Sequence, residues 1–359
     1  MRSDNEINLK YFSVNKTAFF TIVAVLLLTA CKDEEPIAPD NSIPLVQSEP
    51  SYTVLQDENI AYADGLAHNA SSTTPFPVPL LLDVYYPDND VVNRPVFMFI
   101  HGGGFTGGTK TKPEIVAMAD YYASRGWVFA SVDYRTTEEL GTIQGMSQEE
   151  LITFYRGIVP QEWIENALQG AQTPGQVQQA IAMYLAQRDA KAALRWITAN
   201  ADTYDINKDF ITVGGASAGA ITTIALGISN PEDFRDEITV SDDPTLSTTN
   251  LNETYDVKSM IYFWGSNIKL DVFEGVYGLN RYDSNDPELF MAHGDQFDPV
   301  TPYEEALELQ SIYDSLGIHN ELVTLHDFGH GAWDAVVDGK GLSELSFDFI
   351  VERQDLRVE

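Results

Sequence analysis

Residues 213–219 read Val-Gly-Gly-Ala-Ser-Ala-Gly, and this stretch decides the fold. Gly215 to Gly219 matches G-x-S-x-G, in which a serine lies on a sharp turn between a strand and a helix with its hydroxyl exposed. The surrounding sequence fits that context, because the apolar run 211–213 precedes the motif and another apolar run, 221–228, follows it. The stretch therefore predicts a strand, a tight turn that presents Ser217, and a helix.

A second glycine-rich segment, His101-Gly102-Gly103-Gly104, also follows an apolar run, residues 95–100. Consecutive glycines let backbone N–H groups approach a ligand closely, and such groups stabilise negative charge that develops on a carbonyl oxygen. For either motif alone, the simpler explanation is a glycine-containing turn that has no functional role. Together and in this order, each after a strand, the two motifs favour a serine hydrolase.

A serine hydroxyl is a weak nucleophile, so this chemistry also needs a base and a group that orients the base. The usual order along the chain is serine, then acid, then histidine. The histidines that follow Ser217 are His293, His319, His326 and His330. We expect His330 to be the base, because glycines flank it on a loop after the predicted strand 320–325. His326 is the alternative, whereas a buried structural role is expected for His293 and an exposed position for His319.

The chain resembles the α/β-hydrolase carboxylesterases, close to their hormone-sensitive-lipase-like and bacterial feruloyl and acetyl-xylan esterase-like branches. The matching segments, in family order, are FIHGGGFTGG (99–108), SRGWVFASVDYR (124–135), DAKAALRWI (189–197), GGASAGA (214–220), HGDQFDPVTPY (293–303) and FGHG (328–331). The resemblance covers roughly residues 80–352. It implies an α/β-hydrolase fold with a mostly parallel central sheet and helices on both faces. It says little about the substrate, because this fold hosts many chemistries.

The resemblance also implies roles for individual residues. It implies Ser217 as the nucleophile, His330 as the base and an aspartate of the loop 295–298 as the orienting acid. The implied oxyanion donors are the backbone N–H groups of Gly103, Gly104 and Ala218. The residues indicate no metal site, and this mechanism needs no cofactor, so we expect neither.

One departure from the family pattern leaves two candidates for the acid. The family usually places two residues between its His-Gly pair and the acid, whereas three residues separate Gly294 from Asp298. Asp295 and Asp298 both lie on a loop just after a predicted strand, where a carboxylate could accept a hydrogen bond from the histidine. Asp298 begins the Asp-Pro-x-x-Pro-Tyr sequence in the family register, so we prefer it. Asp295 is also a favourable turn residue.

The first residues of the chain indicate an exported lipoprotein. An almost unbroken apolar run, 18–30, is too short for a bilayer span of about 20 residues and is typical of a signal peptide. It ends in Leu-Thr-Ala-Cys at 28–31, which resembles a lipobox whose cysteine, Cys31, is lipidated. Lys-Asp-Glu-Glu at 32–35 resembles the signal that sends lipoproteins of Bacteroidetes-type bacteria to the cell surface. The alternatives are an ordinary cleavable signal and a solvated charge cluster.

The sequence therefore predicts three parts: a lipoprotein signal peptide (1–30), a lipidated, proline-containing tether (31–50) and an α/β-hydrolase catalytic domain (51–359). We expect the protein in the bacterial cell envelope, anchored to the outer membrane by lipid on Cys31 and exposed at the cell surface. The formal net charge of −33 disfavours nucleic acid and anionic membrane surfaces as partners. Cys31 is the only cysteine, so no disulfide can form within the chain.

The predicted domain has strands at 80–86, 95–100, 127–133, 209–214, 257–264, 288–293 and 320–325, with helical patterns between most of them. Segment 136–173 is interpreted as an insertion near the rim of the site, either a substrate-shaping element or a surface excursion. Ser147 and Thr173 are expected to cap helices within and after it. The polar segment 229–256 is predicted to be a long loop.

These observations predict a serine carboxylesterase that hydrolyses short-acyl or aryl esters, on small molecules or on extracellular glycans, through an acyl-enzyme. Three alternatives remain open. A peptidase of the prolyl-oligopeptidase type shares the triad order but usually carries a large gating domain. A lipase would need a longer apolar surface helix. A non-catalytic hydrolase-fold binding module would normally lack one of the three catalytic residue types.

Overall fold

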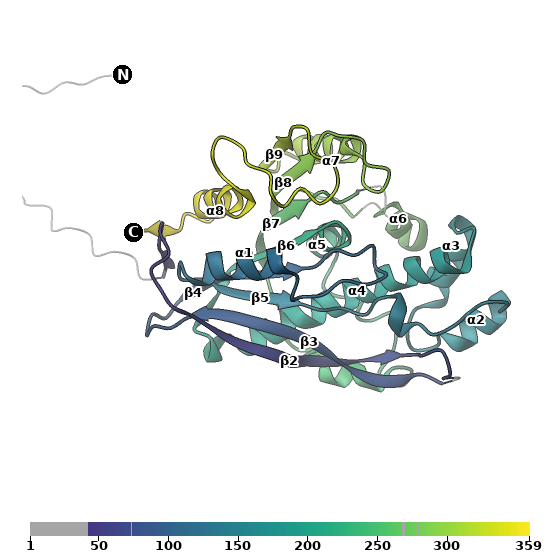
Figure 1. The fold of residues 1–359 in the computed structure, drawn as a ribbon. Helices are drawn as coiled ribbons and strands as arrows, with labels where there is room; N and C mark the ends of the chain where they lie inside the picture. Colours follow the sequence, from purple (N-terminus) through teal and green to yellow (C-terminus); the bar gives the residue numbers. More distant parts are fainter. Residues whose placement is uncertain (1–41, 73, 268–269, 279–280) are drawn as a thin grey trace, which may run out of the picture. The chain divides into compact units, whose positions relative to one another are not determined.

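An eight-stranded sheet forms the centre of the structure (Figure 1). This computed structural model describes residues 42–359 except 73, 268–269 and 279–280. The strands, in their order across the sheet, are β2 (Val54–Ala67), β3 (Phe76–Pro87), β5 (Val128–Val132), β4 (Arg94–Ile100), β6 (Ile206–Ala216), β7 (Val257–Phe263), β8 (Glu288–Gly294) and β9 (Asn320–Leu325). The pairs β2–β3 and β3–β5 are antiparallel and all other pairs are parallel. The prediction of a mostly parallel sheet is confirmed.

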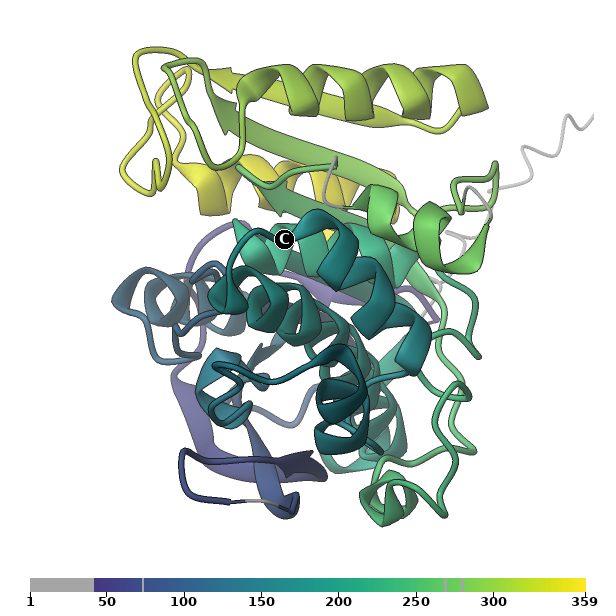
Figure 2. The ribbon, with the colours of Figure 1, turned by 90° about the vertical axis from the view of Figure 1, so that its right-hand side faces the viewer.

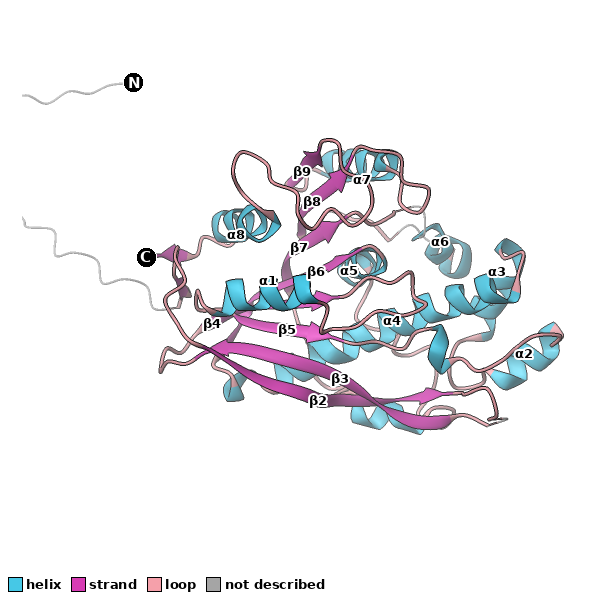
Figure 3. Ribbon diagram, in the orientation of Figure 1, coloured by secondary structure: helices cyan, strands magenta, loops and turns pink. Residues whose placement is uncertain are grey.

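Helices cover both faces of this sheet, as the coloured ribbon in Figure 3 also shows. One face packs against α4 (Pro174–Ala199), α5 (Ala218–Ile228) and α7 (Tyr303–Leu316), and the other against α1 (Pro113–Ala123) and α8 (Leu342–Arg353). Strand β4 shows why. Met98 packs into the core on the face covered by α4, α5 and α7, and its neighbours Phe97 and Phe99 pack into the core on the opposite face. Successive side chains of a strand point to opposite faces, so a strand that is buried on both sides is apolar throughout.

The seven predicted strands correspond to β3 through β9, whereas β2 was not predicted. The sequence of β2 is polar in its first half, and residues 55–56 and 58–59 are exposed. The strand lies at the edge of the sheet, pairs only with β3 and contains register shifts. Its extended conformation therefore depends on hydrogen bonding to β3 rather than on a local apolar pattern.

The predicted signal peptide and Cys31 lie outside the described residues, but the end of the predicted tether does not. Leu45–Val46 forms β1, which pairs in parallel with β10 (Arg357–Val358), and Val46 is fully buried. The prediction of a tether through residue 50 is therefore wrong for this part. The strand is too short to show a periodic pattern, and its partner is at the other end of the sequence.

The predicted insertion 136–173 contains a 3-10 helix, η1 (Thr137–Glu139), and two α-helices, α2 (Gln148–Phe154) and α3 (Gln161–Gly170). Reciprocal capping boxes begin α2 at Ser147 and α4 at Thr173, as expected. Figure 2 looks onto the helices of this region from the right-hand side of Figure 1. Segment 229–256 is mostly turns and includes one 3-10 helix, η3 (Pro244–Thr248). Within the described ranges, no helix has the length and apolarity needed to cross a bilayer.

Candidate active site

Ser217 lies on the sharp turn between β6 and α5. Its backbone φ is +55°, a conformation that costs energy for a residue with a side chain. A Cβ added to Gly215 would lie 2.3 Å from the backbone of Gly219, and one added to Gly219 would lie 2.0 Å from the carbonyl oxygen of Ile100. The two motif glycines are therefore required by close packing around the turn. The serine is only 8 % exposed and lines a cavity.

The structure brings Ser217, His330 and Asp298 together from three separate loops. The Oγ of Ser217 is 2.9 Å from Nε2 of His330, and Nδ1 of His330 is 2.7 Å from Oδ2 of Asp298. These loops follow β6, β9 and β8, three strands whose carboxyl ends meet at one edge of the sheet because they run in parallel. The imidazole is thus placed to take a proton from the serine while the carboxylate stabilises its charged form.

Besides its contact with His330, Asp298 accepts hydrogen bonds from two neighbouring residues. Its Oδ1 accepts hydrogen bonds from the N–H groups of Val300 and Thr301, at 2.8 and 3.2 Å, and its Oδ2 accepts one from the Thr301 hydroxyl at 2.7 Å. Burial acts to raise the pKa of Asp298, but the hydrogen bonds from Thr301, Val300 and His330 outweigh it and hold the pKa below its ordinary value. The group is therefore a carboxylate at neutral pH.

The two alternative candidates pair with each other instead. His326 Nδ1 lies 2.8 Å from Oδ2 of Asp295, and the N–H of Asp327 donates to Oδ1 of the same carboxylate. The His326 side chain is 79 % exposed, and no contact joins this pair to Ser217 within the described residues. The hydrogen bond from His326 lowers the pKa of Asp295. His293 is buried, as expected.

The glycine segment 101–104 packs directly beside the serine. A Cβ on Gly102 would lie 2.7 Å from the carbonyl oxygen of Ala216 and 3.1 Å from Cβ of Ser217. Gly103 and Gly104 have φ values of +134° and +61°, which side chains rarely allow. In the described part of the chain, no backbone carbonyl accepts a hydrogen bond from the N–H of either residue. Ala218 is the first residue of α5, so its N–H has no acceptor within that helix.

A cavity of about 380 Å³ opens beside Ser217. Its apolar lining includes Phe105, Ala167, Ala180, Met183, Ile221 and Val272, and its amide side chains are Asn166, Gln176 and Gln179. None of the described residues that line it carries a charge. Since Asn166 and Ala167 belong to α3, the predicted insertion supplies one wall of this cavity. That placement could not be read from the sequence, because nothing local shows on which side of the site an inserted helix folds.

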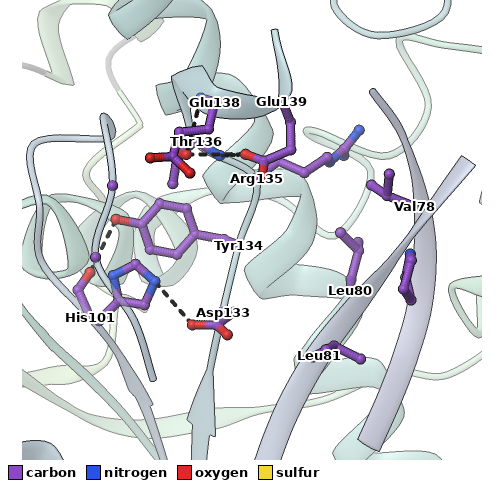
Figure 4. A pocket seen from close by; sticks show the side chains of 13 residues that line it. Val78, Leu80, Leu81, His101, Asp133, Tyr134, Arg135, Thr136, Glu138 and Glu139 are labelled. Atoms are coloured by element: carbon purple, nitrogen blue, oxygen red, sulfur yellow. Dashed lines mark hydrogen bonds and ion pairs between the residues drawn. The ribbon is translucent and has the colours of Figure 1, made fainter. Parts of the chain in front are cut away.

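Behind the glycine segment lies a smaller cavity of about 270 Å³, which Figure 4 shows from close by. His101 lines it, with Nε2 at 3.4 Å from Oδ1 of Asp133 and Nδ1 at 2.7 Å from the carbonyl oxygen of Gly102. Tyr134 stacks on the imidazole and donates its hydroxyl to the His101 carbonyl (Figure 4). Burial lowers the pKa of His101. Individual roles for these three side chains could not be predicted from the sequence.

His68 is a further residue whose place the sequence did not indicate. It is buried, stacks on Phe154 of α2 and bonds through Nε2 to the Phe154 carbonyl oxygen. It therefore ties the insertion to the end of β2. Among the described residues, no group of three or more His, Cys, Asp or Glu side chains could hold a metal ion.

Comparisons with known proteins find a family model and several esterases that are similar to this chain. The BD-FAE family model matches residues 82–143 and 176–269, and the unmatched residues between these segments fall largely within the predicted insertion. Esterase LipC of Mycobacterium tuberculosis is 22 % identical over 244 residues, which are 63 % of this chain and 50 % of the relative. The chain therefore spans about half the length of this curated relative.

Solved structures with the same fold cover most of the chain. A truncated carbohydrate esterase from gut microbiota has 17 % identity and a TM-score of 0.52, over 86 % of this chain and 99 % of that one. Butyrate-bound esterase 2 of Thermogutta terrifontis has 17 % identity and a TM-score of 0.54, over 84 % and 94 % of the two chains. The chain therefore has the α/β-hydrolase fold, and its sequence is similar to the BD-FAE family and to an esterase.

Proposed function

We propose that the protein is a serine carboxylesterase that uses Ser217, His330 and Asp298 as a catalytic triad. The observation that carries the proposal is the pair of contacts at 2.9 and 2.7 Å that link hydroxyl, imidazole and carboxylate in series. A nucleophile bonded to a base, which is itself oriented by a third group, is the arrangement that acyl transfer requires. The carboxylate is ionised and buried, so it can hold Nδ1–H and leave Nε2 free to accept a proton.

In the acylation half, Nε2 of His330 takes the hydroxyl proton as Oγ of Ser217 attacks the ester carbonyl carbon. The carbonyl π electrons move to its oxygen, and the N–H groups of Gly103, Gly104 and Ala218 stabilise that oxyanion. When the C=O bond reforms, the C–O bond to the alcohol breaks. The imidazolium gives its proton to the departing alkoxide, which leaves an acyl ester on Ser217.

In the deacylation half, a water molecule takes the place of the alcohol. Nε2 of His330 removes one of its protons while the hydroxide oxygen attacks the acyl carbon. The second tetrahedral intermediate collapses with cleavage of the bond to Oγ of Ser217, and the imidazolium returns the proton to that oxygen. The products are a carboxylic acid, an alcohol and the free enzyme, so no redox step or cofactor is required.

The cavity beside Ser217 supports short-acyl and aryl esters as substrates. Its uncharged, largely apolar lining favours a neutral acyl group, and its amide side chains can bond to hydroxyl groups of an aryl or glycan substrate. The carbohydrate esterase among the structural neighbours and the butyrate-bound esterase give the same indication for glycan and short-chain esters. We therefore propose acyl groups on extracellular glycans as natural targets.

A chain-length series of p-nitrophenyl esters tests the substrate class. We expect the highest kcat/KM between acetyl and butyryl and a steep fall for long chains, because the cavity of about 380 Å³ is near the small end of the range for ligand pockets. Release of acetate or ferulate from acylated xylan would then identify the natural ester. Best activity on long-chain triglycerides would indicate a lipase, activity on peptide amides alone a peptidase, and absence of labelling by a fluorophosphonate a binding module.

We also propose that the protein is a lipoprotein of the outer membrane, anchored through lipid on Cys31 and exposed at the cell surface. The apolar run at 18–30 and the Leu-Thr-Ala-Cys sequence at 28–31 support this. Two or three acyl chains bind a membrane firmly, whereas a single chain is marginal. Cys31→Ser should therefore leave the protein uncleaved or released from the membrane fraction. Protease treatment of intact cells tests exposure, and protection of the folded domain would contradict the surface location alone.

A further inference from the structure

The glycine segment is held by side-chain contacts on the carbonyl side of its peptide groups. In a trans peptide, the C=O of one residue and the N–H of the next point in opposite directions. Whatever holds the Gly103 carbonyl therefore fixes the direction of the Gly104 N–H. That carbonyl accepts hydrogen bonds from both the N–H and the hydroxyl of Thr106, each at 3.0 Å.

Gly104 needs an anchor on its other side as well. Glycine has more backbone freedom than any other residue, and Gly104 adopts φ = +61° with few neighbours around its Cα. Its own carbonyl oxygen accepts a hydrogen bond of 2.7 Å from Nε2 of Gln179. The two peptide planes that flank Gly104 are thus held by Thr106 on one side and Gln179 on the other.

Gln179 reaches this carbonyl because the start of α4 is fixed. Thr173 and Gln176 form a reciprocal capping box, and Val177 packs into the core. The helix therefore presents Gln179 to the cavity that contains Ser217. The preceding residue, Gln178, points elsewhere and donates to the carbonyl oxygen of Gly141. Two adjacent glutamines thus make the same type of bond to different glycines.

We propose that Gln179 is a positioning residue for the reaction: by holding the peptide between Gly104 and Phe105, it keeps Gly104 in the backbone conformation in which the Gly104 N–H stays aimed at the developing oxyanion. Thr106 supports the preceding peptide group, between Gly103 and Gly104, but its backbone N–H would keep part of that contact if the hydroxyl were lost. Losing the Gln179 side-chain donor should therefore disturb the glycine segment more than losing the Thr106 hydroxyl. The inference rests on the proposed esterase function, because it assigns Gln179 a part in transition-state stabilisation.

The test compares Gln179→Glu with Gln178→Glu in the full chain. Each change keeps the size of the side chain and replaces an amide donor by a carboxylate that can only accept, facing a carbonyl oxygen. For p-nitrophenyl acetate, Gln179→Glu should lower kcat roughly three- to tenfold, the effect of one lost hydrogen bond, with KM little changed. Gln178→Glu should lower the melting temperature by about as much as Gln179→Glu does. It should keep kcat within about twofold, which is a smaller change than the loss of one hydrogen bond causes.

Inhibition by phenylboronic acid separates positioning from a general loss of structure. The boron becomes tetrahedral when Oγ of Ser217 binds it and places an oxygen where the oxyanion forms, so its affinity reports on those N–H groups. We expect Gln179→Glu to weaken inhibition by the same factor as kcat/KM. An unchanged kcat, an equal loss in Gln178→Glu, or a lower kcat with unchanged inhibition would each overturn the inference. Failure of the esterase proposal would instead appear as full activity in Ser217→Ala.

Discussion

Ser217→Ala is expected to lower kcat for p-nitrophenyl acetate by about 10⁶-fold, because the acyl-enzyme can no longer form and only oxyanion binding remains. His330→Ala should cost about as much, since the hydroxyl without its base is not a nucleophile at neutral pH. The two losses should not add in the double variant, because the residues act as a unit. Both effects are measured as initial rates at saturating substrate, with labelling by a fluorophosphonate as a second readout.

His326→Ala is the matched control for this first prediction. His326 is also a histidine of the loop after β9 and also bonds to an aspartate, but its side chain is exposed and it does not contact Ser217. An exposed pair of this kind contributes little to stability, so the variant should fold and keep near-normal turnover. If His326→Ala is inactive and His330→Ala is active, the base is misassigned and the proposed triad with it.

The residues around Ser217 show what local sequence can predict. The turn at 215–219 is specified by close packing that excludes a Cβ at two positions, so its glycines appear directly in the sequence. The seven predicted strands are apolar runs because most of them are buried on both faces. Strand β2 and the pairing of β1 with β10 were not predicted, because they depend on partners far along the chain. Edge strands carry little local signal.

The cavity wall could not be predicted for a related reason. Helix α3 lies within the predicted insertion, and its contact with the cavity depends on packing against α4 and α6 (Asp271–Tyr277). Likewise, the contact between Gln179 and Gly104 joins residues on two separate elements. Sequence patterns report how a segment folds on itself and which face it buries. They do not report which loop a surface amide will reach.

The sequence left the acid as a choice between Asp298 and Asp295, and the geometry now separates their expected effects. Asp298 lies 2.7 Å from the histidine that contacts Ser217, is buried, and receives three further hydrogen bonds from Val300 and Thr301. Within the described residues, the Asp295 side chain bonds to the exposed His326, to the N–H of Asp327 and to the side chain of Gln296. The loop's extra length falls before the Asp-Pro step, so the register of Asp298 relative to His330 is kept.

Asp298→Asn should therefore lower kcat about 10⁴-fold with the fold intact, the loss seen when an amide replaces the acid of a serine-protease triad. An amide that presents its N–H₂ to His330 favours the tautomer with the proton on Nε2, and that nitrogen can then no longer accept the proton of Ser217. Asp295→Asn removes one contact to an exposed histidine and should change kcat less than about threefold, as expected for a surface pair. Both rates are measured across pH 6–9, beside thermal unfolding of each variant. If Asp295→Asn loses most of its kcat and Asp298→Asn keeps a nearly normal kcat, Asp295 is the orienting acid and His326 is the base.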